Sequence, residues 1–204
     1  ASLIRFRDTP LAFWQPQLGA ALATLRAAGV RAVGIDLIQA ASAESWLATL
    51  GAGDTPAGRG YEAPFRAALT AGGVILAAAR GSEGDLLPPL EHQLLLPGGL
   101  DDAALVNLQA DGDGAIRRMR LRHGGEAPSL AFAARLALAA RQRPPTAASL
   151  QLLDPEPDSA RPIPFAGPPG MVPRVSLATL TAPDALQRPE IQALRDKVVI
   201  VAPE

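Results

Sequence analysis

Three short and almost wholly apolar runs constrain the fold of this chain more than any other feature of its sequence. They are VRAVGIDLI at 30–38, VILAAA at 74–79 and KVVIVA at 197–202. Apolar residues on both faces of a short run are typical of a strand that helices cover on both sides. We therefore predict three buried strands.

Segments with helical spacing of apolar residues alternate with these runs. Leu18, Ala21, Leu22 and Leu25 recur at this spacing, and Gly29 stands where that helix would stop. Helix–strand alternation with short glycine turns predicts an α/β fold with a central sheet. The helices are predicted at 16–28, near 61–70, at 129–142 and near 189–195.

Further segments add detail to this sheet. Residues 104–122 read as an antiparallel hairpin, ALVNLQ and AIRRMRLR around the turn DGDG. The predicted sheet is therefore mixed, mostly parallel with one antiparallel hairpin, and flanked by helices in a single domain over residues 1–204. Residues 51–60 read as a glycine-rich loop, 80–101 as an irregular excursion, 150–153 as a short strand, and 163–170 as a strand entering a tight turn.

Composition excludes several classes of function. The chain has no cysteine, which excludes thiolate metal sites, iron–sulfur clusters, disulfides and cysteine nucleophiles. The formal net charge of −1 gives no electrostatic reason to expect nucleic acid as a partner. No apolar run approaches the roughly 20 residues that a membrane-spanning helix needs.

Catalytic and cofactor motifs are not found either. The sequence contains neither a G-x-S-x-G nucleophile elbow nor a G-x-x-x-x-G-K-[ST] phosphate loop. Its two histidines, His92 and His123, lie far apart and outside any H-E-x-x-H pattern. We interpret both as ordinary loop or strand residues, and we predict no catalytic residue, no metal site and no cofactor.

Asp36 is one of two candidate ligand-binding residues. It lies near the carboxyl end of an otherwise apolar predicted strand, and ligands of open α/β sheets bind outside such ends. An ionised carboxylate there must be exposed, paired or hydrogen-bonded. Two readings stay open, namely a structural cap of the following turn or helix and a pocket residue.

Arg117, the second candidate, follows the predicted turn at Asp111–Gly114. A tight turn explains the alternating glycines there better than a calcium loop, which needs more ligands and a bidentate Glu. With a period of two, Arg117 falls on the apolar face of its strand. It then needs a partner, and the choices are Asp36, Asp111 or an anionic ligand. A structural ion pair and a ligand anchor both stay open.

Taken in order, these segments resemble the second type of CHASE domain, a bacterial sensory module. The most specific part is V-N-x-x-x-D-x-D-G-x-x-R at 106–117, followed by P-S-L-A at 128–131. Members of that family usually begin with a strand just ahead of the A-S-L segment, which opens this sequence. The other matching segments are ASLIRF at 1–6, AVGIDLI at 32–38, YEAPFRAAL at 61–69, GGVILA at 72–77, IPFAGPPG at 163–170 and LRDKVVIVA at 194–202.

The resemblance implies an extracytoplasmic sensor domain over residues 1–204, on the periplasmic side of the bacterial inner membrane. The first strand and the flanking membrane helices are expected outside these residues. The parent receptor would be membrane-anchored, homodimeric and would carry a cytoplasmic output domain: an adenylate cyclase, a diguanylate cyclase, a histidine kinase or a Ser/Thr kinase. The domain itself would be no enzyme; it would respond to a small molecule or a physical cue. The alternative is a structural dimerisation module that binds no ligand.

Overall fold

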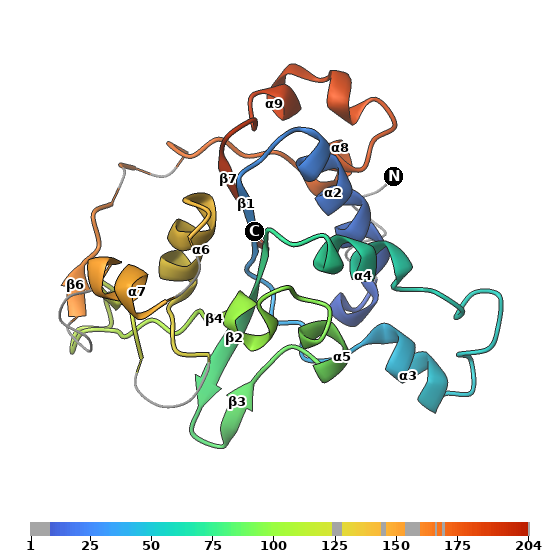
Figure 1. Ribbon diagram of the computed structural model, residues 1–204, viewed down its shortest axis with the longest axis horizontal. Helices are drawn as coiled ribbons and strands as arrows, with labels where there is room; N and C mark the ends of the chain where they lie inside the picture. Colours follow the sequence, from blue (N-terminus) through green and yellow to red (C-terminus); the bar gives the residue numbers. More distant parts are fainter. Residues whose placement is uncertain are drawn as a thin grey trace.

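A five-stranded mixed sheet lies at the centre of the chain (Figure 1). The computed structural model describes residues 9–123, 128–143, 146–153, 160–165, 167–168 and 170–203. The first strand in the sequence is central, because it pairs in parallel with both the second and the last. The strands are β1 (Ala32–Ile35), β2 (Val74–Gly81), β3 (Gly84–Leu86), β4 (Ala103–Leu105) and β7 (Val198–Val201).

The pairing confirms the predicted fold class. β4 is parallel to the middle of β2, with Ala77 opposite Ala104. β3 is antiparallel to the end of β2, with Arg80 opposite Asp85. The sheet is thus mostly parallel with one antiparallel pair, as predicted.

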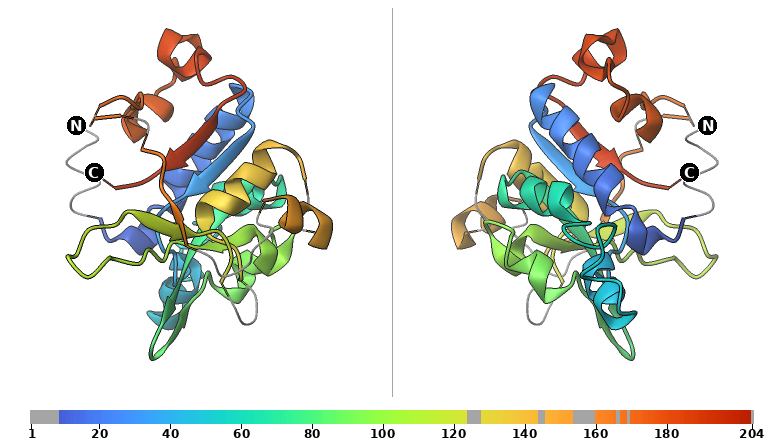
Figure 2. Two further views of the ribbon diagram at one scale, coloured as in Figure 1. Left: turned by 90° about the vertical axis from the view of Figure 1, so that its left-hand side faces the viewer. Right: turned by 90° about the vertical axis from the view of Figure 1, so that its right-hand side faces the viewer.

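Helices cover both faces of this sheet (Figure 2). On one face, α2 (Gln15–Ala27) and α4 (Ala63–Thr70) pack on side chains such as Val33 and Leu76. On the other face, α6 (Phe132–Ala140) packs on Ala32, Ile75, Ala77 and Ala104. Successive residues of β1 are buried against opposite layers, which is why its sequence is apolar throughout.

Two glycines allow very close contacts, one between α2 and α4 and one between β1 and α6. A Cβ on Gly19 of α2 would lie 2.4 Å from backbone atoms of Pro64 and Phe65, so α2 and α4 meet main chain to main chain. A Cβ on Gly34 of β1 would lie 2.6 Å from the Phe132 ring, so the absence of a side chain there lets α6 approach the strand closely. The short apolar side chains of this sequence therefore permit tight packing of helices on each other and on the sheet.

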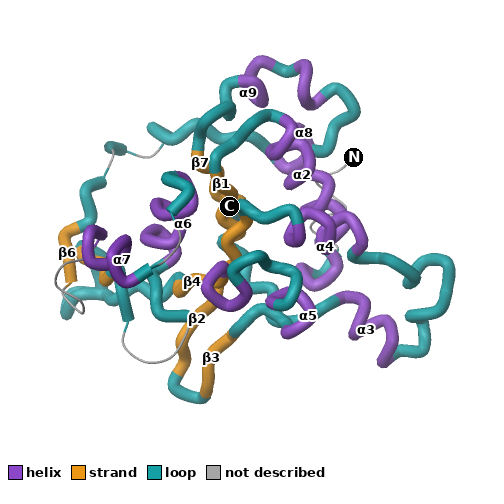
Figure 3. Tube along the Cα trace, viewed as in Figure 1, coloured by secondary structure: helices purple, strands orange, loops and turns teal. Residues whose placement is uncertain are grey.

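Shorter elements surround the sheet. Long loops connect many of them, including the 50–62 segment that runs along the edge of the molecule (Figure 3). The 3-10 helices are η1 (Leu11–Phe13), η2 (Gly99–Asp102) and η3 (Ala185–Gln187). The remaining helices are α3 (Ala43–Thr49), α5 (Leu90–Gln93), α7 (Ala147–Leu153), α8 (Leu177–Leu180) and α9 (Pro189–Gln192). A second, two-stranded antiparallel sheet consists of β5 (Arg118–Arg120) and β6 (Ala160–Pro162).

The predicted hairpin at 104–122 is only partly formed. Its turn is present, because the Gly114 N–H donates to the Asp111 oxygen at 2.9 Å with Gly114 at φ 81°. The two arms share a single bridge, Gln109 with Arg118, and β5 pairs with β6 instead. The antiparallel pair of the main sheet is β2 with β3, inside the segment that we expected to be irregular.

Two other local predictions were wrong. Residues 150–153 (LQLL) belong to helix α7 and not to a strand, since three leucines in four residues fit either period. β7 is a strand, as predicted, but it forms an edge and is only half buried. Val198 and Ile200 are 43% and 56% exposed, because α6 does not cover this strand. The segment at 1–6 lies outside the described residues.

Candidate functional site

Asp36 directly follows β1, as predicted, and its side chain is exposed. Its backbone N–H donates to the Val201 oxygen at 2.8 Å and extends the pairing of β1 with β7 by one residue. Within the described residues, the structure assigns no hydrogen bond or ion pair to its carboxylate. A ligand role for Asp36 stays a prediction.

Arg117 is exposed, which corrects the prediction that it faces the core. Its guanidinium donates to the Asp111 carboxylate at 3.1 Å and to both carboxylate oxygens of Asp113, at 2.9 and 2.8 Å. Arg117 lies just before β5, where the chain turns back after Gly114, so it closes the turn instead of following a strand period. Asp111 was among the partners considered, whereas Asp113 was not.

The turn around Arg117 is therefore a local salt-bridged unit. The hydrogen bond from Arg117 lowers the pKa of Asp113, and the two aspartates raise the pKa of Arg117. Because all three side chains are solvated, these contacts hold the turn but contribute little to global stability. A role for Arg117 in ligand binding stays a prediction as well.

The structure shows a different polar site, which the sequence analysis missed. His92 lies on α5 with no solvent exposure, and its Nε2 is 2.8 Å from Oε2 of the equally buried Glu62. Its ring also packs edge-on against Phe65, with 5.3 Å between the ring centroids. His92 is thus neither a loop nor a strand residue. His123 lies in the segment after β5, where its backbone N–H donates to the backbone carbonyl of Ser129 at 2.7 Å.

Glu62 connects three helices through its carboxylate. It is the N-cap residue of α4, while its Oε1 accepts the N–H groups of Ala43 and Glu44 in the first turn of α3, the latter at 3.3 Å. In return, the Glu44 carboxylate accepts the Glu62 N–H at 3.0 Å. Through this reciprocal capping, α3 and α4 satisfy each other's free N–H groups. We name Ser42, Glu44, Glu62 and His92 the carboxylate–imidazole cluster.

The surroundings of Glu62 keep it ionised. Burial alone would raise its pKa, but hydrogen bonds from His92, Ser42 and the Ala43 N–H, together with the attraction of His92, outweigh burial and lower this pKa. A buried carboxylate with several donors is the arrangement in which charge is tolerated inside a protein. Glu62 is therefore a fixed buried anion with its donors in place.

A second buried polar pair joins the start of α2 to the loop after β1. Gln15 Nε2 donates to Gln39 Oε1 at 3.0 Å, and both side chains are almost completely buried. Since Ser42, which caps α3, follows Gln39 by three residues, this contact positions the same loop. The segment between β1 and α3 is thus fixed by side chains from α2 and α4.

The cluster has the residue types of a catalytic triad but not its order. In a triad the imidazole lies between hydroxyl and carboxylate, and so acts as the base. Here the Glu62 carboxylate lies between the Ser42 hydroxyl and the His92 ring, and these three side chains are buried. Among the described residues, no group of three or more His, Asp and Glu side chains could hold a metal ion. The geometry supports helix positioning and not turnover.

Comparison with known proteins gives one result. The family model of the CHASE2 domain matches residues 11–204. No curated protein and no solved structure matches the chain. Of the helices described, none combines the length and the apolar character needed to cross a membrane.

Proposed function

The chain belongs to the CHASE2 domain family, and from this premise we propose that it relays an external cue to a cytoplasmic cyclase or kinase. CHASE2 domains are extracytoplasmic sensory domains of signalling receptors, so the chain is a sensory domain and not an enzyme. The proposal places it on the periplasmic side of a bacterial inner membrane, in a membrane-anchored receptor. The family match over residues 11–204 is the observation that carries this proposal.

The proposed relay requires two arrangements of the domain. A cue acts only by stabilising one arrangement more than the other, and moving a 1:99 equilibrium to 99:1 takes about 5.5 kcal/mol. The carboxylate–imidazole cluster supports this mechanism, because the relative positions of α3, α4 and α5 depend on a few buried polar contacts. Such contacts are either made or broken, so a packed unit of this kind changes in discrete steps.

Glu62→Gln in the complete receptor tests the relay without knowledge of the cue. The variant weakens the cluster, and we expect the basal activity of the output domain in membranes to change at least twofold. Glu83→Gln is the matched control, since Glu83 is an exposed carboxylate in the β2–β3 turn. Unchanged output from a Glu62→Gln receptor whose sensory domain is still folded at the assay temperature would contradict the relay.

The dimerisation module is the second candidate, and β7 favours it. Val198 and Ile200 are exposed on an edge strand of four β-branched residues, where a second copy of the chain could pair. Sedimentation of Val198→Lys and of the unchanged chain distinguishes this candidate. A dimer that the variant loses would support it, and a chain that is monomeric at high concentration would exclude this surface.

A further inference from the structure

A cavity of about 170 Å³ lies at the amino-terminal ends of β1 and β2, where α2 and α4 end. This is the opposite end of β1 from Asp36, where the sequence predicted a ligand site. Its walls are apolar and include Leu22, Val33, Ala68 and Val74, and two arginines, Arg26 and Arg31, also line it.

The size of the cavity indicates the size of its occupant. An engineered apolar cavity of about 150 Å³ in another protein binds benzene. The cavity here is partly open to solvent and has a similar volume of about 170 Å³, so it has room for a phenyl ring or a branched chain of four or five carbons. Larger metabolites, such as nucleotides, would extend well outside it.

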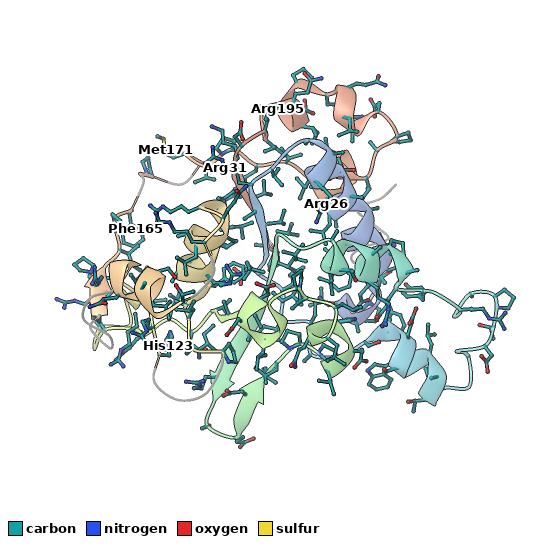
Figure 4. The ribbon with its side chains drawn as sticks, viewed as in Figure 1. Arg26, Arg31, His123, Phe165, Met171 and Arg195 are labelled. Atoms are coloured by element: carbon teal, nitrogen blue, oxygen red, sulfur yellow. The ribbon has the colours of Figure 1, made fainter. Side chains whose placement is uncertain are left out.

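The charge around the cavity indicates the sign of its occupant. Arg26 belongs to the last turn of α2, Arg31 precedes β1, and Arg195 lies across Gly29, with its Nη1 3.5 Å from where a Cβ would stand. Figure 4 shows these three arginines at one end of the sheet. The carboxyl ends of α2 and α4 contribute about half a negative charge each, which three guanidinium groups exceed. With Asp196 as a nearby acid, the local charge stays positive.

Among the described residues, most guanidinium donors of Arg26 and Arg31 have no partner and are available to a ligand. Arg26 uses one nitrogen for the Gly72 carbonyl, and Arg31 uses one for Asp196 at 3.6 Å. The Arg31–Asp196 pair is weak, since its two side chains are 56% and 68% exposed. A guanidinium has five N–H donors in a planar fork that matches a carboxylate. Arg31 is therefore the better placed of the two to bind an anion at the mouth.

We propose that this cavity binds a small organic carboxylate whose apolar body is about the size of benzene. As a further step that rests on the proposed function, this carboxylate is the cue of the receptor. Arg31 connects the site to the last strand, because its backbone N–H donates to the Lys197 oxygen at 2.8 Å. The Asp196 N–H donates to the Gly29 oxygen at 2.9 Å, so the backbone on either side of Arg31 is hydrogen-bonded to the segment that leads into β7.

Titration of the chain with benzoate, followed by calorimetry, tests the site. We expect Arg31→Gln to weaken benzoate binding about tenfold or more, the effect of losing one charge-assisted contact. Benzyl alcohol, an uncharged analogue of similar size, should bind weakly and respond less than about twofold to this variant. Ala68→Leu places a larger side chain in the cavity and should abolish the binding of both compounds.

Arg59→Gln is the matched control, because Arg59 is an exposed arginine in the 51–60 loop and does not line the cavity. Circular dichroism verifies that each variant is folded. Three results would each overturn the site: no benzoate binding up to about 10 mM, an equal loss in Arg31→Gln and Arg59→Gln, or unchanged binding in Ala68→Leu.

Measurements on the receptor separate the site from the relay. Benzoate that binds the domain but leaves the output activity unchanged would retain the site and refute its role as the place of the cue. Output that responds to Glu62→Gln in a receptor whose domain binds no benzoate would retain the relay and refute the site. Binding together with a benzoate response that Arg31→Gln removes would support both.

Discussion

Replacing Glu62 by Gln should destabilise the domain by about 3 kcal/mol. The substitution keeps the shape but removes the charge that accepts hydrogen bonds from Ala43, Glu44 and His92. A hydrogen bond to a charged group contributes about 1 kcal/mol more than a neutral one. The two hydrogen bonds from the N–H groups of Ala43 and Glu44 therefore account for about 2 kcal/mol.

The remainder comes from the imidazole. The amide oxygen of Gln can keep the two N–H groups of α3, which turns its NH₂ toward Nε2 of His92. Nε2 must then accept, so the donor of the ring is Nδ1, which is buried and has no hydrogen-bond partner among the described residues. An unsatisfied buried donor costs about 1–3 kcal/mol. We take the lower limit of this range, since a water molecule could reach the site after relaxation.

Guanidinium denaturation followed by circular dichroism measures this loss. For a domain of this size, a loss of about 3 kcal/mol in the free energy of unfolding corresponds to a decrease in Tm of about 6–12 °C. Glu83→Gln is the matched control, and its change should stay within about 0.5 kcal/mol. Adding His92→Leu to Glu62→Gln should cost less than the sum of the two single losses, because the orphaned partner is gone. A loss below about 1 kcal/mol for Glu62→Gln would refute the role of Glu62 as a buried anion.

Three further predictions follow from individual contacts. The pKa of Glu62 is lower in the folded than in the unfolded chain. The stabilisation that its charge contributes is therefore complete above the unfolded pKa of about 4.3 and is lost as pH falls through the folded pKa. The denaturation midpoints of the unchanged chain and of Glu62→Gln should therefore converge in acid. Gly19→Ala should cost at least about 3 kcal/mol, because its Cβ meets the backbone of α4, whereas Ala20→Gly on the exposed side of α2 should cost about 1 kcal/mol, both by denaturation. Arg117→Gln should leave the denaturation midpoint unchanged while the pKa of Asp113, followed by NMR, rises to its ordinary value; an unshifted Asp113 would contradict the ion pair.

Local patterns predicted the centre of the fold well. The buried parts of β1 and β2, residues 32–35 and 74–78, are apolar throughout because helices cover both faces, and periodicity detects this directly. The run at β7 has the same composition, yet one of its faces is open. Whether a strand is covered depends on the length and direction of distant helices, here α6. The four apolar residues of β7 alone do not indicate whether α6 reaches them.

The candidate site was harder to predict, for a related reason. Glu62 looks like an ordinary residue ahead of a helix, and the A-P that follows it is a signal of a helix start. Its partner His92 is 30 residues further along the chain, on a helix of four residues inside a segment that we expected to be irregular. Pairing across that distance is decided by tertiary packing. The prediction that Arg117 faces the core was wrong for another reason. It assumed a period of two along a strand, and the turn before β5 interrupts that period.

The pairing of β1 with β7 has a consequence for the time at which the domain can form. Residues 32–35 pair with 198–201, so all of the chain between these two strands must be present before β1 gains its second neighbour. Contacts between such distant segments form slowly, since a long loop must close first. A chain released from its amino end, by a ribosome or by an export channel, therefore stays incomplete until its last strand emerges. For a domain that works outside the cytoplasm, the centre of the sheet is therefore completed only when residues 198–201 have joined it.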